Sequence, residues 1–430
     1  MVVSSEPHAT SSRLGSPLSS ARGHFRQGTS EHEHKPAQQL PRHVPEDVPT
    51  HSALTITLHL SSAPVEASVP TPAQSTMGSK FWPRGGNPGI LHHITETLVA
   101  FEFTTGSRPQ PNSILFVGGL GDGLATTSYL ADVVTALQPT SWSLFSPNLS
   151  SAYTAWGFSH LDRDTDEIAS CIKHIQDYKA SRYGSPGRIV LMGHSTGSQA
   201  VLHYLSRPNP HTSAPKFDRG LEHVLRPKLD GAIMQAPVSD REALKWVVRE
   251  GFLGRTPEEM KESFDELVRL AKEGLKNEDP TADSMLPITL TRQFGYPGNT
   301  PISCRRWLSL ASPDSPRSPG EDDMFSSDLG DEQIARTWGM VGPRGLLGFK
   351  LMVLMSGRDQ AVPDWVDKQK LLARWRDAAE RGGAYKVWDR ERSGLIPNAS
   401  HALSDDDQAE PRQFLCRRIL DYLDELDRSL

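Results

Sequence analysis

The chain has 430 residues and a formal net charge of −6 at pH 7. This length allows one large domain or two domains of ordinary size. The weakly acidic charge excludes the basic footprint of a nucleic-acid-binding or anionic-membrane-binding protein. No apolar run approaches the roughly 20 residues that a membrane-spanning helix needs. We therefore expect neither a nucleic-acid partner nor a membrane span.

The first 76 residues differ in composition from the rest of the chain. They are rich in Pro, Ser, His and Thr, and only residues 53–60 alternate as a strand would. Such a composition predicts a disordered, low-complexity extension, and it lacks the apolar core of a secretory signal. Met77 opens the first ordered-looking sequence, so translation starting there is an alternative that would make the extension dispensable.

Cysteine usage indicates the compartment. The chain contains three widely spaced cysteines, Cys171, Cys304 and Cys416. This number and spacing fit neither a disulfide framework nor a metal site, and they are typical of a reducing compartment. We expect a cytoplasmic protein that has no metal and no cofactor.

From about residue 90, short apolar segments alternate with amphipathic helical segments. The predicted strands are 98–103, 113–117, 142–145, 188–192, 231–236, 350–355 and 385–388. The predicted helices are one containing residues 129–137, then 164–183, 198–205 and 411–426. Asp164 and Glu167 are placed as a capping pair for the second helix. The alternation predicts a mostly parallel sheet with helices on both faces.

The motif Gly193-His194-Ser195-Thr196-Gly197 lies between a predicted strand and a predicted helix. In that context Gly-x-Ser-x-Gly is a nucleophile elbow, a tight turn that lifts the serine hydroxyl above the sheet. The motif predicts an α/β-hydrolase domain over residues 77–430 with Ser195 as its nucleophile. The alternative is an ordinary strand-to-helix turn with a solvated serine.

The alternation stops between Ala236 and Lys350, far longer than the usual connection in such folds. We predict a cap insertion over about residues 239–345, following the strand that ends near Ala236. Within it, residues 258–275 have helical periodicity and residues 314–321 are predicted to be disordered. Caps over active sites select substrates and exclude water.

A serine nucleophile needs a base and an acid that orients the base, and this fold supplies them in the order Ser, acid, His. Asp359 follows the late strand 350–355, and His401 follows the last predicted strand. We predict these two residues as the acid and the base. Asp240, after the strand 231–236, remains the alternative acid.

The glycine-rich run at residues 118–123 follows the predicted strand 113–117. We expect the backbone N–H groups of Leu120 and Thr196, with Gly119 as a further donor, to form an oxyanion hole. A phosphate-binding loop is the competing interpretation, but no Lys-Ser/Thr follows the run. Three nearby aromatic residues line the substrate pocket or pack beneath the cap: Tyr153, Trp156 and Phe158.

Several segments together resemble one fungal α/β-hydrolase family long known only as a domain of unknown function. They are residues 91–94, 116–123, 150–157, 193–197, 235–242 and 322–329, and the similarity extends from about residue 80 to the C-terminus. The family includes intracellular siderophore ester hydrolases that cleave fusarinine-type iron chelators. The resemblance therefore implies a small-molecule ester substrate of the siderophore class, and it also favours order in residues 322–329.

The leading hypothesis is a serine ester hydrolase that releases iron by cleaving siderophore esters. A general carboxylesterase, lipase or acyltransferase of the same fold is the second hypothesis. The third is a non-catalytic, hydrolase-like binding protein, which the ordered presence of Ser195, Asp359 and His401 disfavours. Nothing in the sequence indicates the oligomeric state.

Overall fold

A computed structural model describes residues 81–83, 86–104, 108–211, 217–218, 220–276 and 283–429. The predicted disordered extension 1–76, its run at 53–60 and Met77 lie outside these residues. No helix in the described ranges is long and apolar enough to cross a membrane.

The described chain is organised around an eight-stranded sheet with the order β1-β2-β4-β3-β5-β6-β7-β8. Its strands are β1 (Gly89–His93), β2 (Val99–Phe103), β3 (Asn112–Val117), β4 (Trp142–Asn148), β5 (Ile189–His194), β6 (Gly231–Gln235), β7 (Leu351–Ser356) and β8 (Gly394–Ile396). The pairs β1–β2 and β2–β4 are antiparallel, and all other pairs are parallel. The predicted mostly parallel sheet and the α/β-hydrolase fold are confirmed.

Two strand assignments change. The predicted last strand at 385–388 is wrong, because it makes only one bridge, between Trp388 and Leu351. The last strand is β8, which pairs with the end of β7. The edge strand β1 was not predicted, because its only fully buried residue is the polar His92 and the strand therefore lacks a strong apolar pattern.

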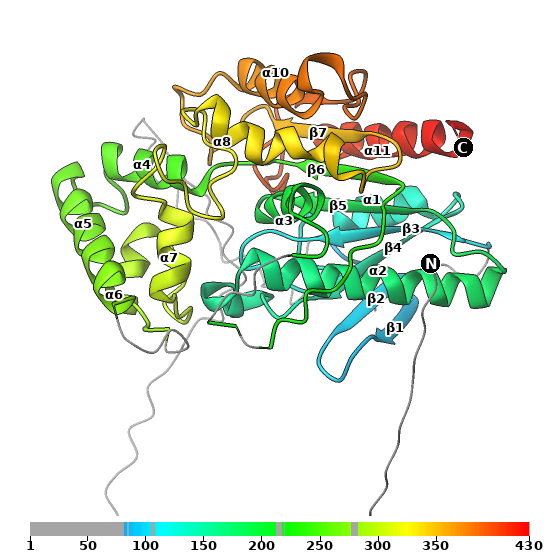
Figure 1. Cartoon of the computed structure of the whole chain (residues 1–430), viewed down its shortest axis with the longest axis horizontal. Coiled ribbons are helices and arrows are strands. Elements are labelled where there is room, and N and C mark those ends of the chain that lie inside the picture. Colours follow the sequence, from blue (N-terminus) through cyan, green and yellow to red (C-terminus); the bar gives the residue numbers. More distant parts are fainter. Residues whose placement is uncertain are drawn as a thin grey trace, which may run out of the picture. The chain divides into compact units, whose positions relative to one another are not determined.

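Alternating side chains of the central strands enter two cores on opposite faces of the sheet. Helices α1 (Leu130–Leu137) and α11 (Ala409–Ser429) contribute to one core. Helices α2 (Leu161–Tyr183), α3 (Thr196–Ser206) and α10 (Lys368–Ala379) contribute to the other, with residues from α8 (Asp331–Arg336) and α9 (Val341–Arg344). Leu191 and Met192 of β5, for example, enter different cores, as the two-residue period of a strand requires. Figure 1 shows these helices around the sheet.

Helix α2 begins earlier than predicted. Its first residue is Leu161, so Asp164 lies inside the first turn and does not cap the helix. The Glu167 carboxylate instead accepts a hydrogen bond from the Ser150 N–H at 2.7 Å. The predicted capping pair is therefore wrong, because both acids have partners in the loop before the helix.

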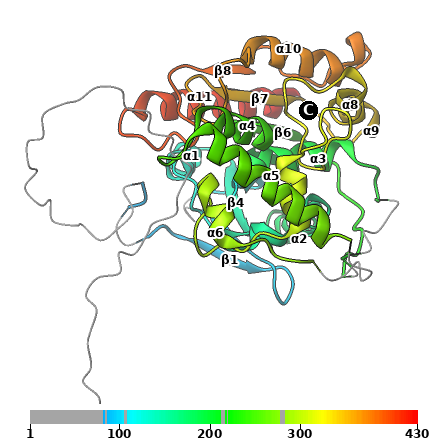
Figure 2. The same cartoon turned by 90° about the vertical axis from the view of Figure 1, so that its left-hand side faces the viewer.

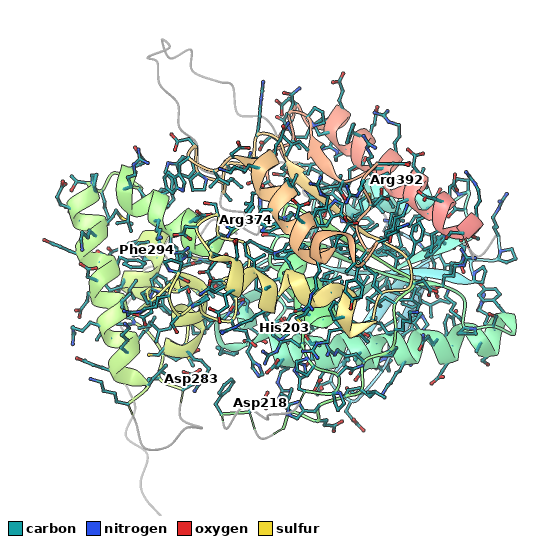
Figure 3. The ribbon with its side chains drawn as sticks, turned by 45° about the horizontal axis from the view of Figure 1, so that its top comes forward. His203, Asp218, Asp283, Phe294, Arg374 and Arg392 are labelled. Carbon is teal, nitrogen blue, oxygen red and sulfur yellow. The ribbon has the colours of Figure 1, made fainter. Side chains whose placement is uncertain are left out.

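The insertion between β6 and β7 contains α4 (Asp240–Glu250), α5 (Pro257–Gly274), α6 (Ile288–Thr291) and α7 (Cys304–Ala311), gathered at one end of the molecule (Figure 1; Figure 2). Thr256 and Glu259 form a reciprocal capping box that fixes the start of α5. The insertion has its own apolar core, which includes Phe294 and Trp307, and Figure 3 labels Phe294 there. Trp156, which lies after β4 and outside the insertion, also belongs to that core. The cap therefore packs directly on the segment after β4.

Residues 314–321 do not form the predicted disordered excursion. The Ser312 hydroxyl accepts a hydrogen bond from the Gly320 N–H at 2.8 Å, which closes the segment on itself. Ser315 donates to Asp323, and Asp322 is buried. The abundance of polar residues misled the prediction, because these side chains bind one another instead of water.

Candidate active site

Ser195 lies at the sharp turn between β5 and α3, with φ 51° and ψ −120°. The turn requires close backbone approach on both sides. A Cβ on Gly197 would lie 2.3 Å from the Val117 carbonyl oxygen, and one on Gly193 would lie 2.2 Å from the Gly197 carbonyl oxygen. Glycine at these two positions therefore leaves room for the strained backbone conformation of Ser195.

The three residues predicted as nucleophile, base and acid form one hydrogen-bonded chain. The Ser195 hydroxyl lies 2.8 Å from His401 Nε2, and His401 Nδ1 lies 2.9 Å from Asp359 Oδ2. A carboxylate only accepts hydrogen bonds, so His401 carries its proton on Nδ1 and accepts the serine proton on Nε2. This is the arrangement that lets a histidine act as a general base.

Local contacts hold the acid and the base in place. Asp359 Oδ1 accepts a hydrogen bond from the Ala361 N–H at 2.9 Å, in a turn directly after β7. The His401 N–H donates to Gln360 Oε1 at 2.9 Å. The loops after β7 and β8 are therefore tied together at the site, which fixes the orientation of the imidazole.

The charges around His401 favour the protonated form of its imidazole. Burial opposes its positive charge, but the adjoining Asp359 carboxylate, together with the charges of Asp240 and Asp122, outweighs burial and raises the pKa of His401 above its ordinary value of 6.5. The neighbouring His194 behaves in the opposite way, because burial and the charge of His401 lower its pKa. His194 is neutral at pH 7 and donates through Nδ1 to Gln235 Oε1 at 2.5 Å. Only one of the two adjacent histidines is thus suited to accept the serine proton.

This difference predicts the pH dependence of the reaction. A general base must be unprotonated, so kcat/KM for an ester should fall as the pH drops through the pKa of His401. The apparent pKa of this limb should lie above 6.5, and it should move downward in Asp359→Asn because the raising carboxylate charge is gone. The measurement is kcat/KM against pH for both proteins. An apparent pKa at or below 6.5 for the fall in kcat/KM of the unaltered protein would contradict the assignment.

The alternative acid, Asp240, has other partners. It is the first residue of α4, and its carboxylate accepts a hydrogen bond from Gln199 Nε2 at 2.9 Å. Burial, together with the nearby Asp322, raises the pKa of Asp240 to about 6. Both carboxylate oxygens that contact His401 Nδ1 belong to Asp359. The geometry therefore favours Asp359 as the orienting acid.

The glycine-rich loop after β3 packs directly on the elbow. Asp122 anchors the loop, since its Oδ2 accepts hydrogen bonds from the Gly119 N–H at 2.9 Å and from Thr127 Oγ1 at 2.8 Å. The Gly119 N–H is therefore already engaged, which argues against its suggested part in the oxyanion hole. The N–H of Thr196 is the first of α3 and has no acceptor within the helix. Leu120 and Thr196 remain the predicted donors.

Gly119 still matters for shape. A Cβ at this position would lie 2.9 Å from the Ser195 Cβ and 3.3 Å from His194 Cδ2. Gly119→Ala should displace the loop from the elbow and lower kcat by roughly 10²-fold, the scale seen when one oxyanion donor is misplaced. Steady-state kinetics of Gly119→Ala and of the control Gly298→Ala, whose Cβ would meet no atom within 4 Å, test this expectation. Equal kcat in the two variants would show that the loop does not shape the site.

A cavity adjoins the predicted oxyanion donors. Leu120, Thr196 and Trp156 line it, as do the polar side chains of Asp164 and Arg306. Trp156 thus meets the expectation of a lining residue while it also packs on Tyr296 of the cap, with ring centroids 5.2 Å apart.

The other two predicted lining residues lie elsewhere. Tyr153 packs on Gly123, and its hydroxyl accepts a hydrogen bond from the Leu124 N–H at 3.1 Å. Phe158 is 49% exposed, and neither residue lines the cavity. Tyr153 therefore supports the glycine-rich loop from outside.

Three contributors to the site were not predicted. Asp122 anchors the glycine-rich loop, Gln235 fixes His194, and Arg306 brings a positive charge from α7 into the cavity. Asp122 follows β3 and Gln235 is the last residue of β6, so their places at the carboxyl ends of strands could have indicated them. Arg306 lies in the cap, where no local pattern connects a residue to the elbow.

Comparisons with known proteins agree over most of the chain. The family model described as "Protein of unknown function (DUF1749)" matches residues 78–424. The fusarinine C esterase sidJ of Aspergillus fumigatus is 62% identical over 356 residues, which cover 82% of this chain and 100% of that protein. An esterase of Emericella nidulans is 46% identical, covering 80% of this chain and 94% of that protein.

One solved structure is also closely similar. The siderophore hydrolase EstB from Aspergillus fumigatus has a TM-score of 0.70 and 57% sequence identity, over 80% of this chain and 100% of that one. A family model that covers more than half of the chain, supported by relatives of this identity and coverage, shows that the chain belongs to the DUF1749 family.

Proposed function

We propose that this chain is a serine ester hydrolase that cleaves ester bonds of fusarinine-type siderophores. The observation that carries the proposal is the hydrogen-bonded chain from Ser195 through His401 to Asp359. The fusarinine C esterase and siderophore hydrolase relatives support the substrate class. Three free cysteines suit a reducing compartment such as the cytoplasm.

In the proposed first step the Ser195 oxygen attacks the ester carbonyl carbon, and its proton moves to His401 Nε2. Asp359 stabilises the imidazolium that forms. The N–H groups of Leu120 and Thr196 donate to the oxyanion of the tetrahedral intermediate. When that intermediate collapses, the leaving alcohol takes the proton from His401, and the acyl group remains on Ser195.

In the second step water attacks the acyl-enzyme and His401 accepts its proton. Collapse returns the proton to the Ser195 oxygen and releases the carboxylic acid. Every proton thus passes through His401 Nε2, the atom within 2.8 Å of the serine hydroxyl. No metal takes part in these steps, and any iron belongs to the substrate.

Product analysis separates this proposal from a general esterase, lipase or acyltransferase. The same preparation is given a fusarinine-type siderophore with and without bound iron, a p-nitrophenyl acyl ester, and a monoacylglycerol. We expect kcat/KM for the siderophore ester to exceed that of the other esters by about 100-fold or more, because contacts to the remote parts of a preferred substrate stabilise its transition state. Faster turnover of a simple ester, or transfer of the acyl group to an added alcohol, would contradict the substrate assignment.

A further inference from the structure

A second cluster of polar side chains lies outside the triad. Asp162 in the first turn of α2, His203 in α3 and His211 in the segment after α3 are all buried. One oxygen or nitrogen from each lies within 4.8 Å of the other two. Asp162 Oδ1 is 2.7 Å from His203 Nε2 and 3.4 Å from His211 Nδ1. Figure 3 labels His203 in the body of the molecule, away from Phe294 of the cap.

The cap adds a fourth group. Glu321 Oε1 lies 3.5 Å from His203 Nε2. In a tetrahedral site with metal–ligand bonds of about 2.0–2.1 Å, ligand atoms lie roughly 3.4 Å apart. The separations from Asp162 to His211 and from His203 to Glu321 match this value. The 2.7 Å contact between Asp162 and His203, a hydrogen bond when no metal is bound, would have to lengthen. The Glu321 carboxylate would also have to move closer, because it lies outside the trio of residues whose ligand atoms are all within 4.8 Å of one another.

His211 distinguishes this cluster from an ordinary hydrogen-bonded network. The residue is 6% exposed, and neither of its ring nitrogens has a hydrogen-bond partner among the described residues. Buried imidazole nitrogens are normally hydrogen-bonded, because losing water without a replacement costs free energy. Its Nδ1 faces the Asp162 carboxylate, which is where a shared cation would lie.

Two arginines nearby do not occupy the site. Arg226 directs its guanidinium to the backbone carbonyls of His203, Tyr204, Arg207 and Pro208. Arg207 Nε is 3.9 Å from Asp162 Oδ1, beyond hydrogen-bond distance, and its side chain is 44% exposed. The carboxylates of Asp162 and Glu321 would supply the negative charge that balances a divalent cation.

We propose that Asp162, His203 and His211, with Glu321 as the fourth ligand, bind one divalent transition-metal ion, for which Zn²⁺ is the best chemical match. Two imidazoles and two carboxylates form a nitrogen–oxygen set that suits tetrahedral Zn²⁺. The role would be structural, since His203 belongs to the elbow helix α3. Glu321 precedes Asp322, which pairs with Arg306 of α7 at 2.6 Å. A bound ion would therefore fasten the cap to the helix that carries the nucleophile.

This site could not be predicted from the sequence, because its ligands do not form a spaced motif. Asp162 and His203 are 41 residues apart in sequence, and Glu321 comes from the insertion. Folding alone brings them together.

The test uses the full chain after treatment with a chelator and dialysis. Zn²⁺ alone is titrated by calorimetry, and Tm is measured with and without it. We expect one ion per chain and a rise in Tm, because a ligand that binds only the folded state stabilises it. His211→Ala should abolish both effects without removing any native hydrogen bond, and Glu321→Gln should weaken binding. His93→Ala, which alters an exposed histidine, is the control and should behave as the unaltered chain does.

Absence of stoichiometric binding in the unaltered chain would overturn the proposal. An equal rise in Tm in His211→Ala would also overturn it, because the ion would then bind elsewhere. Neither readout depends on ester hydrolysis, so failure here leaves the proposed serine chemistry untouched.

Discussion

Replacing Ser195 with alanine is expected to lower kcat/KM for ester hydrolysis by about 10³-fold or more. The Ser195 hydroxyl is the group that His401 Nε2 contacts at 2.8 Å, and alanine has nothing to attack the carbonyl carbon. The fold should survive, because the change removes one oxygen from a residue that is 8% exposed. Steady-state kinetics, with circular dichroism as the check on folding, measure the effect.

The double variant Ser195→Ala/His401→Ala sharpens this expectation. If the two residues act as one unit, the second substitution should cost little beyond the first. Fully multiplicative losses would show that His401 acts independently of the serine. Near-normal hydrolysis by Ser195→Ala would remove the nucleophile assignment altogether.

The second large effect is expected for Asp359→Asn, which should lower kcat by about 10³- to 10⁴-fold. An asparagine amide can donate to His401 Nδ1 and so favour the tautomer whose Nε2 carries the proton. That tautomer cannot accept the Ser195 proton, and the imidazolium would also lose its balancing charge. Measuring kcat at several pH values separates this loss from a simple pKa shift.

Asp240→Asn is the matched control, because it makes the same chemical change at the other candidate acid. Its carboxylate contacts Gln199, so we expect kcat to change by less than about 10-fold. The reverse order of effects, with Asp240→Asn the more damaging substitution, would identify Asp240 as the orienting acid.

The central part of the site could be predicted from sequence because its signals are local. Ser195 lies in a short motif between a strand and a helix, and Asp359 and His401 each follow a late strand in the order this fold uses. Parallel strands bring such positions to one edge of the sheet, so chain order alone placed the three residues near one another.

Three of the remaining errors share a physical cause, which is that polar groups form contacts within the protein that the residue types alone do not indicate. Asp164 seemed to cap a helix but lines the cavity beside Arg306 of the cap. Residues 314–321 seemed too polar to fold but are closed by Ser312 and Gly320. The suggested donor Gly119 is engaged by Asp122, a contact that depends on the exact path of the loop. Composition and periodicity carry no information on such contacts.

The central claim is that Ser195 is an activated nucleophile, and covalent labelling tests it most directly. The full chain is incubated with a fluorophosphonate probe and analysed by intact-protein and peptide mass spectrometry. We expect one probe per chain, attached to Ser195, with no labelling of Ser195→Ala. Labelling of a different residue, or undiminished ester hydrolysis by a preparation that the probe does not label, would contradict it.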